Sequence, residues 1–223
     1  MRLVSLLLAG LNPELIITQD LCRVCALPSG QVSDALDYLG CRAEVLSLDP
    51  YTLDEVLGTV LAVGARAAVP ERANDLVTAL RARLARVAAA VVGRPRPRVA
   101  VVEWVDPPFP AGHWVPDLVS AAGGEPVAAR PGARSVQTTW EEFTAAEPDV
   151  VVVSPCGFHL DGAAKQAEAV APLFPGAAIW AIDGDGLIVR PGPRLVDGVE
   201  TLAAILHPGA FPAVSESAAI RVA

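Results

Sequence analysis

The sequence lacks several features that would assign it to a class at once. No apolar run approaches the ~18 residues that a bilayer-spanning helix needs, so we expect a compact, soluble protein. Four cysteines among 223 residues are too few for a disulfide scaffold. The 17 basic residues are outnumbered by 25 acidic ones, and the net charge of −8 argues against a nucleic-acid partner.

Short catalytic motifs are missing as well. The chain contains no G-x-S-x-G, P-loop, H-E-x-x-H or G-x-G-x-x-G pattern. Residues 183–186, Asp-Gly-Asp-Gly, look like the start of a calcium loop, but the later acidic ligand is missing, so a turn is expected. We therefore predict a protein that is not an enzyme and that requires no cofactor.

Apolar residues, in contrast, are abundant. They make up 52% of the chain and charged residues 19%, which is enough for one large domain or two small lobes. Residues 1–10 carry one Arg and a short apolar run without a convincing cleavage site, so a buried first strand is favoured over a signal peptide. As the sequence stands, we expect a cytoplasmic location.

Strand and helix signals alternate along both halves of the chain. Apolar β-branched runs predict strands at 14–18, 43–48, 98–104, 150–153 and 178–182. Capping residues and helical apolar spacing predict helices at 31–39, 52–63, 113–122, 139–146, 160–171 and 193–206. This order predicts an α/β fold of Rossmann-like lobes with mostly parallel sheets.

A long helix is expected between the two halves. Apolar residues recur at helical spacing over 70–92, and Gly93, Pro95 and Pro97 end the run. Such a helix suits a rigid spine better than a flexible linker. The predicted division is a shortened N-terminal lobe (1–69), an interlobe spine helix (70–94), a C-terminal lobe (95–208) and a tail (209–223).

The two halves share a pattern, and a gap interrupts the first copy. Residues 2–6 resemble 98–102, and residues 12–17 resemble 147–152. Arg98 and Pro148 are 50 positions apart, whereas Arg2 and Pro13 are 11 apart, so the first half is 39 positions shorter. We expect an incomplete N-terminal lobe in which a helix, a strand and another helix are missing.

Several segments resemble class III periplasmic binding proteins of ABC importers, the cobalamin and iron-siderophore type, and most closely the cobalamin-binding subgroup. The matching segments are 13–26, 46–50, 103–109, 112–116, 154–158 and 190–194. The resemblance implies two lobes joined by a long helix, a metal chelate held between them, and no catalysis. It also implies an ABC importer permease as partner and a periplasmic or cell-surface location.

Aromatic residues provide the best candidates for a ligand wall. Trp104 ends a predicted strand, Phe109 and Trp114 lie beyond it, and Phe158 is the fourth candidate. A flat macrocycle needs broad apolar contact, which aromatic residues supply. The alternative is ordinary core packing. Asp106 lies in the same segment and is counted among the ligand-binding residues.

Three polar residues complete the predicted ligand site. By resemblance, Asp183 and Arg190 bond polar groups at the rim of the ligand; the alternative is a surface ion pair, which contributes little to stability. His113 is a candidate axial ligand for cobalt or iron, and a helix cap is the alternative for it.

Three cysteines support a different hypothesis. Cys22 and Cys25 form a C-x-x-C on a loop after a strand, and Cys156 follows a second strand. Together they suit zinc or another metal, or a redox pair, while structural thiols are the alternative.

The sequence thus predicts a substrate-binding protein that captures a corrinoid, most specifically cobalamin, for ABC-type import. The alternatives are a thiol-based metal or redox protein and a truncated remnant that binds nothing. A homodimer that buries the flank left open by the shortened lobe is a further expectation.

Overall fold

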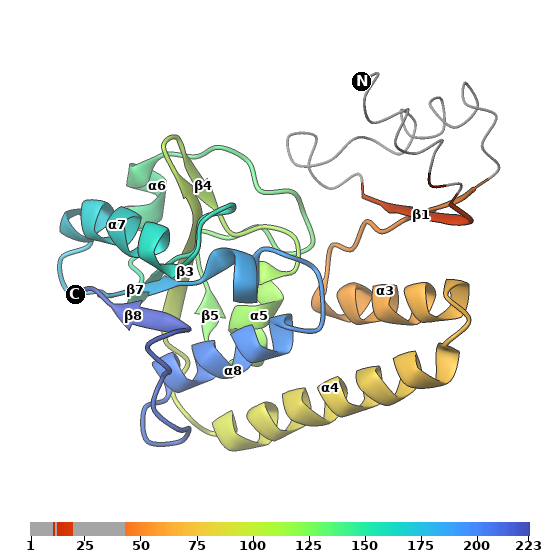
Figure 1. Cartoon of the computed structure of the whole chain (residues 1–223). Coiled ribbons are helices and arrows are strands. Elements are labelled where there is room, and N and C mark those ends of the chain that lie inside the picture. Colours follow the sequence, from red (N-terminus) through yellow and green to blue (C-terminus); the bar gives the residue numbers. More distant parts are fainter. Residues whose placement is uncertain (1–10, 12, 20–42) are drawn as a thin grey trace. The chain divides into compact units, whose positions relative to one another are not determined.

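The computed structural model describes residue 11, residues 13–19 and residues 43–223 of the chain. The chain divides into two compact units, Met1–Pro50 and Tyr51–Ala223 (Figure 1). None of the helices in these described parts is long and apolar enough to cross a membrane.

The first unit contains a pair of parallel strands. β1 (Leu15–Thr18) pairs with β2 (Glu44–Ser47), with Leu15 opposite Glu44 and Thr18 opposite Ser47. Both strands were expected from their apolar, β-branched runs, and both are confirmed. The helix predicted at 31–39 and the strand predicted in residues 1–10 lie outside the described residues.

The second unit is built on a six-stranded sheet with the order β4-β3-β6-β7-β8, in which β5 also pairs with β3. β3, β5, β6 and β7 are mutually parallel where they pair, and β4 and β8 are antiparallel edge strands. The parallel-dominated α/β fold expected from the sequence is confirmed. The strands are β3 (Arg98–Val105), β4 (Pro108–Pro110), β5 (Glu125–Pro126), β6 (Val150–Val153), β7 (Ala178–Ile182) and β8 (Ala219–Arg221).

Strand β8 lies in the segment 209–223, which the sequence analysis treated as a tail. Its residues pair with β7, with Ala219 opposite Ile182 and Arg221 opposite Trp180. The pairing satisfies backbone groups along the edge of β7 that would otherwise be left without partners. The end of the chain is therefore part of the sheet.

The helices begin and end near their predicted limits, and their capping residues explain why. Thr52 and Glu55 form a reciprocal capping box at the first helix, and the Thr139 hydroxyl accepts a hydrogen bond from the Glu142 amide. The helices of this unit are α3 (Leu53–Arg66), α4 (Pro70–Val91), α5 (Val115–Ala121), α6 (Trp140–Ala145), α7 (Leu160–Val170) and α8 (Leu195–Leu206).

The core lies on both faces of this sheet. All four residues of β6 are buried, as expected for a parallel strand covered on both sides. Ala100 and Val102 of β3 belong to a cluster with residues of α6 and α7. On the other face, Val99 approaches α5 and α8 around Gly124. Figure 1 shows these two helix pairs on opposite faces of the sheet.

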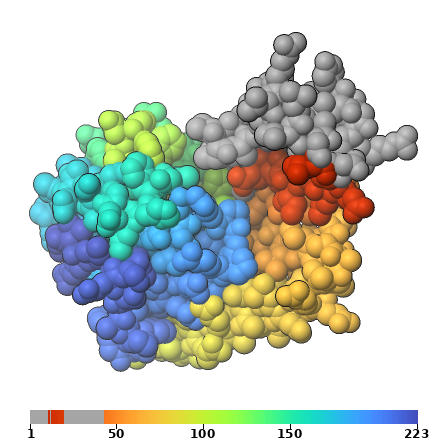
Figure 2. All heavy atoms as spheres, in the orientation of Figure 1, coloured from red at the N-terminus to blue at the C-terminus, as the bar shows by residue number. Residues whose placement is uncertain are grey.

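Helices α3 and α4 form an antiparallel hairpin in the second unit. A Cβ at Gly64 of α3 would lie 2.3 Å from the Cβ of Ala73 in α4, so glycine permits this close approach. A buried cluster of Leu57, Val77, Leu80 and Val196 joins the hairpin to α8. In the space-filling view α4, in yellow, borders the blue atoms of the C-terminal part of the chain (Figure 2).

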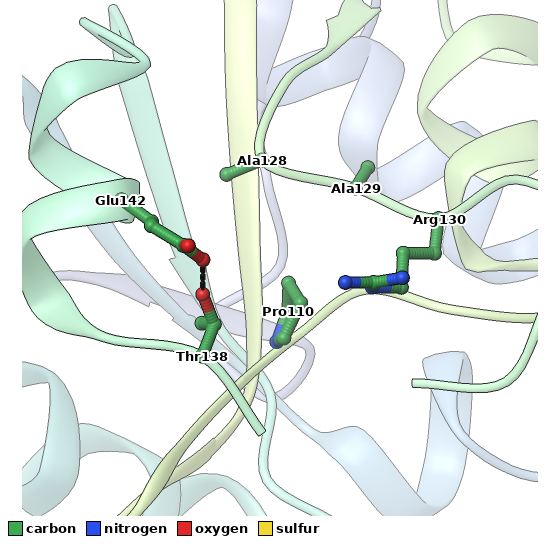
Figure 3. A pocket seen from close by; sticks show the side chains of 6 residues that line it. All are labelled: Pro110, Ala128, Ala129, Arg130, Thr138 and Glu142. Carbon is green, nitrogen blue, oxygen red and sulfur yellow. Dashed lines mark hydrogen bonds between the residues drawn. The ribbon is translucent and has the colours of Figure 1, made fainter. Parts of the chain in front are cut away.

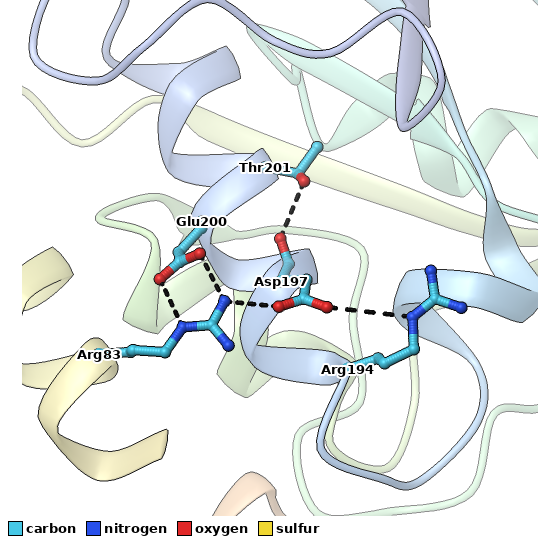
Figure 4. A network of polar contacts seen from close by, with 5 residues as sticks. All are labelled: Arg83, Arg194, Asp197, Glu200 and Thr201. Atoms are coloured by element: carbon cyan, nitrogen blue, oxygen red, sulfur yellow. Dashed lines mark hydrogen bonds and ion pairs between the residues drawn. The ribbon is translucent and has the colours of Figure 1, made fainter. Parts of the chain in front are cut away.

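A charged network also holds α4 to α8 (Figure 4). The guanidinium of Arg83 donates to Glu200 at 2.6 and 2.9 Å and to Asp197 at 2.5 Å. The hydrogen bond with Glu200 raises the pKa of Arg83, and the same bond lowers the pKa of the Glu200 carboxyl. The two parallel hydrogen bonds between the Arg83 guanidinium and the Glu200 carboxylate hold α4 against α8 in one rotational orientation.

Candidate ligand-binding site

The carboxyl ends of β3, β6 and β7 lie at one edge of the six-stranded sheet because these strands are parallel. The segments that follow them, 104–114, 154–159 and 183–190, form what we call the rim. In open α/β sheets, ligands bind beyond this edge of the strands. All eight ligand-binding residues predicted from the sequence lie in these three segments, and one of them, Trp114, is buried.

Three aromatic residues gather at the rim. The rings of Trp104 and Phe158 are 5.7 Å apart between centroids, tilted by 51°, and the residues are 37% and 36% exposed. Phe109 is the antiparallel register partner of Trp104. The Trp104 indole N–H donates to the Asp106 carbonyl at 2.8 Å, which fixes the ring plane. The structure therefore joins residues from β3, β4 and the loop after β6 into one aromatic surface.

Phe158 owes its position to a glycine. A Cβ at Gly162, in the first turn of α7, would lie 2.6 Å from Cδ1 of the Phe158 ring. Glycine at position 162 therefore leaves the room that the Phe158 ring occupies beside the start of α7.

Trp114 is placed differently from the prediction of a ligand wall. It is 5% exposed, and its indole N–H donates to the Ile188 carbonyl at 2.9 Å. Burial of the ring satisfies the indole N–H inside the protein, as buried tryptophans require. Trp114 thus connects the start of α5 with the turn after β7 in the core.

His113 lies between two aromatic rings. Its centroid is 5.3 Å from that of Tyr51 and 5.7 Å from that of Trp114. Burial lowers the pKa of His113, and the charge of Arg134 lowers it further, so the imidazole is neutral at neutral pH.

The alternative assignment of His113 as a helix cap is wrong, because the N-cap of α5 is Trp114. In the described part of the chain, the buried Nε2 of His113 has no hydrogen-bond partner. A neutral imidazole with an unoccupied nitrogen has the chemistry of a metal ligand, although this nitrogen is covered by protein.

The acidic turn after β7 is tied to the loop after β6. Asp183 accepts a hydrogen bond from the Gly186 amide at 3.0 Å and lies 3.3 Å from Nδ1 of His159. Asp185, whose side chain is 8% exposed, accepts from the Gly157 amide at 2.9 Å and from Arg190 at 2.5 Å. Arg190 therefore forms its ion pair with Asp185. The alternative to ligand binding had been a surface ion pair between Arg190 and Asp183.

Glu103 is a polar residue of the site that the sequence analysis missed. Burial raises its pKa to about 7, while a hydrogen bond from the Gly112 amide, 3.0 Å from Oε1, acts in the other direction. A hydrogen bond with the Ser135 side chain also lowers the pKa of Glu103. A carboxylic residue next to an apolar strand end, within the run Val-Val-Glu-Trp, was the available signal in the sequence.

A cavity of about 270 Å³ opens next to β4, between the segment after β5 and the start of α6 (Figure 3). The Thr138 hydroxyl donates to the Glu142 carboxylate on one wall, and Arg130 lies on the opposite wall. The remaining lining residues are Pro110, Ala128 and Ala129. This cavity was not predicted from the sequence.

The thiol-metal hypothesis falls mostly outside the described structure. Cys22 and Cys25 belong to the residues that the structure does not describe, and Cys156 is exposed on the loop after β6. Within residues 43–223 and the short described stretch before them, no group of three His, Cys, Asp or Glu side chains is placed to hold a metal ion.

Solved structures share the fold of this chain. An ABC transporter substrate-binding protein from Listeria monocytogenes is 16% identical, with a TM-score of 0.74 over 91% of this chain and 80% of that chain. A periplasmic heme-binding protein from Pseudomonas aeruginosa is 25% identical, with a TM-score of 0.73 over 97% and 80%. A periplasmic vitamin B12-binding protein of Vibrio cholerae is 23% identical, with a TM-score of 0.63 over 92% and 78%.

Sequence comparison gives the family. No curated protein sequence matches the chain. The model of the family described as periplasmic binding protein matches residues 7–171, which is well over half of the chain. That family consists of binding proteins without a catalytic function or resident cofactor, in agreement with the missing enzyme motifs. The chain therefore belongs to the periplasmic binding protein family.

Proposed function

We propose that this protein captures a corrinoid, cobalamin or a close relative, and delivers it to an ABC importer. The family match and the similarity to a substrate-binding protein of an ABC transporter support the transport role. The similarity to a vitamin B12-binding protein supports the ligand class. The family description also supports a periplasmic location.

The observation that carries the proposal is the aromatic surface of Trp104, Phe109 and Phe158 at the carboxyl edge of the sheet, in which Trp104 and Phe158 are exposed. Adjacent aromatic rings that stay exposed to water are unusual unless they have a function, because burying one such side chain stabilises a folded protein by about 1.5–3 kcal/mol. A flat macrocycle covers several rings at once, and rings with few torsions lose little entropy on binding.

The charges around the rim favour a corrinoid over a heme. Asp183 and Asp185 bring negative charge to the turn after β7, and Arg190 is already neutralised by Asp185. Corrinoids present mostly neutral amide side chains, whereas heme presents two carboxylates that need unpaired cations. Amides can exchange hydrogen bonds with Asp183.

A titration tests this proposal. We expect cyanocobalamin and cobinamide to quench tryptophan fluorescence saturably, with calorimetry giving a micromolar or tighter affinity, and hemin to bind more weakly. Trp104→Ala should weaken binding. Trp140→Phe is the matched control, since Trp140 packs against Phe143 and Phe174 away from the rim. Stronger binding of hemin than of either corrinoid would reassign the ligand, and no binding of any of the three would reject the chelate proposal.

The domain arrangement is part of the same proposal. We propose that α4 is the spine helix between a shortened N-terminal lobe and the C-terminal lobe. Scattering measurements with and without cyanocobalamin should then show a small decrease in the radius of gyration. A protein that dimerises through the shortened lobe would instead have twice the expected mass in solution.

A further inference from the structure

The cavity beside β4 has groups of opposite charge on two facing walls (Figure 3). The guanidinium of Arg130 extends toward Pro110 from one wall, and the carboxylate of Glu142 lies with the Thr138 hydroxyl on the other. The volume of about 270 Å³ is slightly below the ~300–1,000 Å³ of common small-molecule sites. The cavity therefore suits a ligand that is smaller than a drug-sized molecule.

The cation on the first wall has no partner. Arg130 is exposed, and within residues 43–223 and the short described stretch before them its guanidinium forms no ion pair and donates no hydrogen bond. Arg190, in contrast, is already paired with Asp185. A guanidinium presents several donors in one plane, which match the two oxygens of a carboxylate. Arg130 thus gives the cavity an unused capacity to bind an anion.

The backbone next to Arg130 adds further donors. The amides of Val127 and Arg130 donate to carbonyls of β3 and of the loop after β4, at 2.9 and 2.8 Å. Ala128 and Ala129 lie between these two bonds and line the cavity, and their amides donate to no residue of the described structure. Ala128 has a φ of 44°, in the left-handed region that alanine seldom adopts. Two unbonded amides beside an arginine favour an anionic group.

The facing wall supplies an acceptor. Glu142 accepts the Thr138 hydroxyl hydrogen through Oε2, and in the described parts of the chain its Oε1 has no hydrogen-bond partner. The Glu142 amide donates to the Thr139 hydroxyl at 3.3 Å, which holds this residue at the start of α6. A carboxylate oxygen only accepts hydrogen bonds, so this wall requires a donor such as an ammonium group.

We propose that the cavity binds a small zwitterion, a molecule with one carboxylate and one ammonium group on a short chain. The carboxylate pairs with Arg130 and the ammonium with Glu142. A simple anion would face the charge of Glu142, and a simple amine would face Arg130, so a ligand with both charges satisfies both walls. None of the three rings of the aromatic surface lines this cavity, and the site is additional to the proposed corrinoid function.

The test is a titration of the whole 15N-labelled chain with ω-amino acids from glycine to 6-aminohexanoate, followed by NMR. We expect saturable shifts of the Ala128 and Ala129 amides and a maximum of affinity at one chain length, because the protein fixes the distance between the two charges. Butyrate and butylamine carry one charge each and should bind about 10-fold more weakly or less. No saturable shift with any ω-amino acid, or equal affinity for a singly charged probe, would overturn the proposal.

Two pairs of variants test the assignment of the charges. Arg130→Gln and Glu142→Gln should each weaken binding by about 10-fold, because each removes one charge-assisted contact. Arg72→Gln on α4 and Glu168→Gln on α7 make the same changes at exposed positions that do not line the cavity, and should leave the affinity unchanged. Equal effects in both pairs would refute the site. The titration contains no corrinoid, so its failure is distinct from a failure of the proposed function.

Discussion

Neighbouring residues at the end of β3 have opposite surroundings. Trp104 is partly exposed beside Phe158. The Glu103 carboxyl accepts a hydrogen bond from the Gly112 amide. One strand end therefore supplies both a contact surface and a group that is bonded to the adjoining loop. The rim therefore has an exposed apolar side and a covered polar side with separable roles.

The largest expected effect comes from disrupting the close contact between Gly112 and Ser135. Gly112→Ala places a Cβ 2.4 Å from the Ser135 nitrogen, so the loops that carry these two residues must separate. We expect the free energy of unfolding to fall by about 2–3 kcal/mol, measured by urea denaturation. Gly58→Ala is the control, because a Cβ there meets nothing within 4 Å and should stabilise α3 by about 0.5–1 kcal/mol. Equal effects of the two substitutions would disprove this close contact.

Breaking the apolar side should affect binding and not stability. Trp104→Ala removes an exposed contact surface, so we expect corrinoid affinity to fall about 10- to 100-fold, or about 1.4–2.7 kcal/mol. The midpoint of urea denaturation should change little, since the ring is partly exposed in the free protein. Calorimetry and denaturation on the same sample separate the two effects. A large loss of stability would mean that Trp104 is a core residue.

A change of pH tests the buried Glu103 carboxyl separately from the aromatic surface. The pKa of Glu103 is raised from its ordinary value of 4.5 to about 7 on folding, so the folded protein retains a proton that the unfolded chain loses. Its contribution to stability is complete below about pH 4.5 and is lost as pH rises toward 7. Glu103→Gln should therefore gain about 1–2 kcal/mol relative to wild type between pH 5 and pH 8. A pH-independent difference between the two proteins would contradict this.

The smallest expected effect concerns the turn after β7. Asp185→Asn keeps an acceptor for the Gly157 amide and removes the ion pair with the largely exposed Arg190. We expect a loss of about 0.5 kcal/mol or less that disappears at high salt. Denaturation at low and at molar sodium chloride measures it. A loss of more than about 2 kcal/mol would mean that Asp185 stabilises the whole rim and not only its ion pair with Arg190.

Local sequence signals predicted most of the secondary structure correctly. The valine run of β6 and the apolar runs of β3 and β7 are buried strands, and Thr52 with Glu55 caps α3 as expected. These predictions succeeded because they depend on residues that are near one another in the chain. The strand β8 was missed because it exists only by pairing with the edge of β7.

The candidate site was predicted less completely. Trp104, Phe109 and Phe158 do meet, but Trp114, which has the same residue type and a similar position after β3, is buried with its N–H bonded to Ile188. Composition and spacing cannot separate these two tryptophans. The partner that covers one of them comes from the turn after β7, far along the chain.

By itself, the sequence determined the alternation of strands and helices, the family, and the collection of aromatic and acidic residues after the strands, because each of these depends on local pattern or on matched segments. Only the tertiary structure decided which aromatic rings stay exposed, that Arg190 pairs with Asp185, and that Glu103 meets Gly112 and Ser135. The physical reason is that desolvation and hydrogen bonding act between groups close in space, and the sheet brings those groups together from distant parts of the chain.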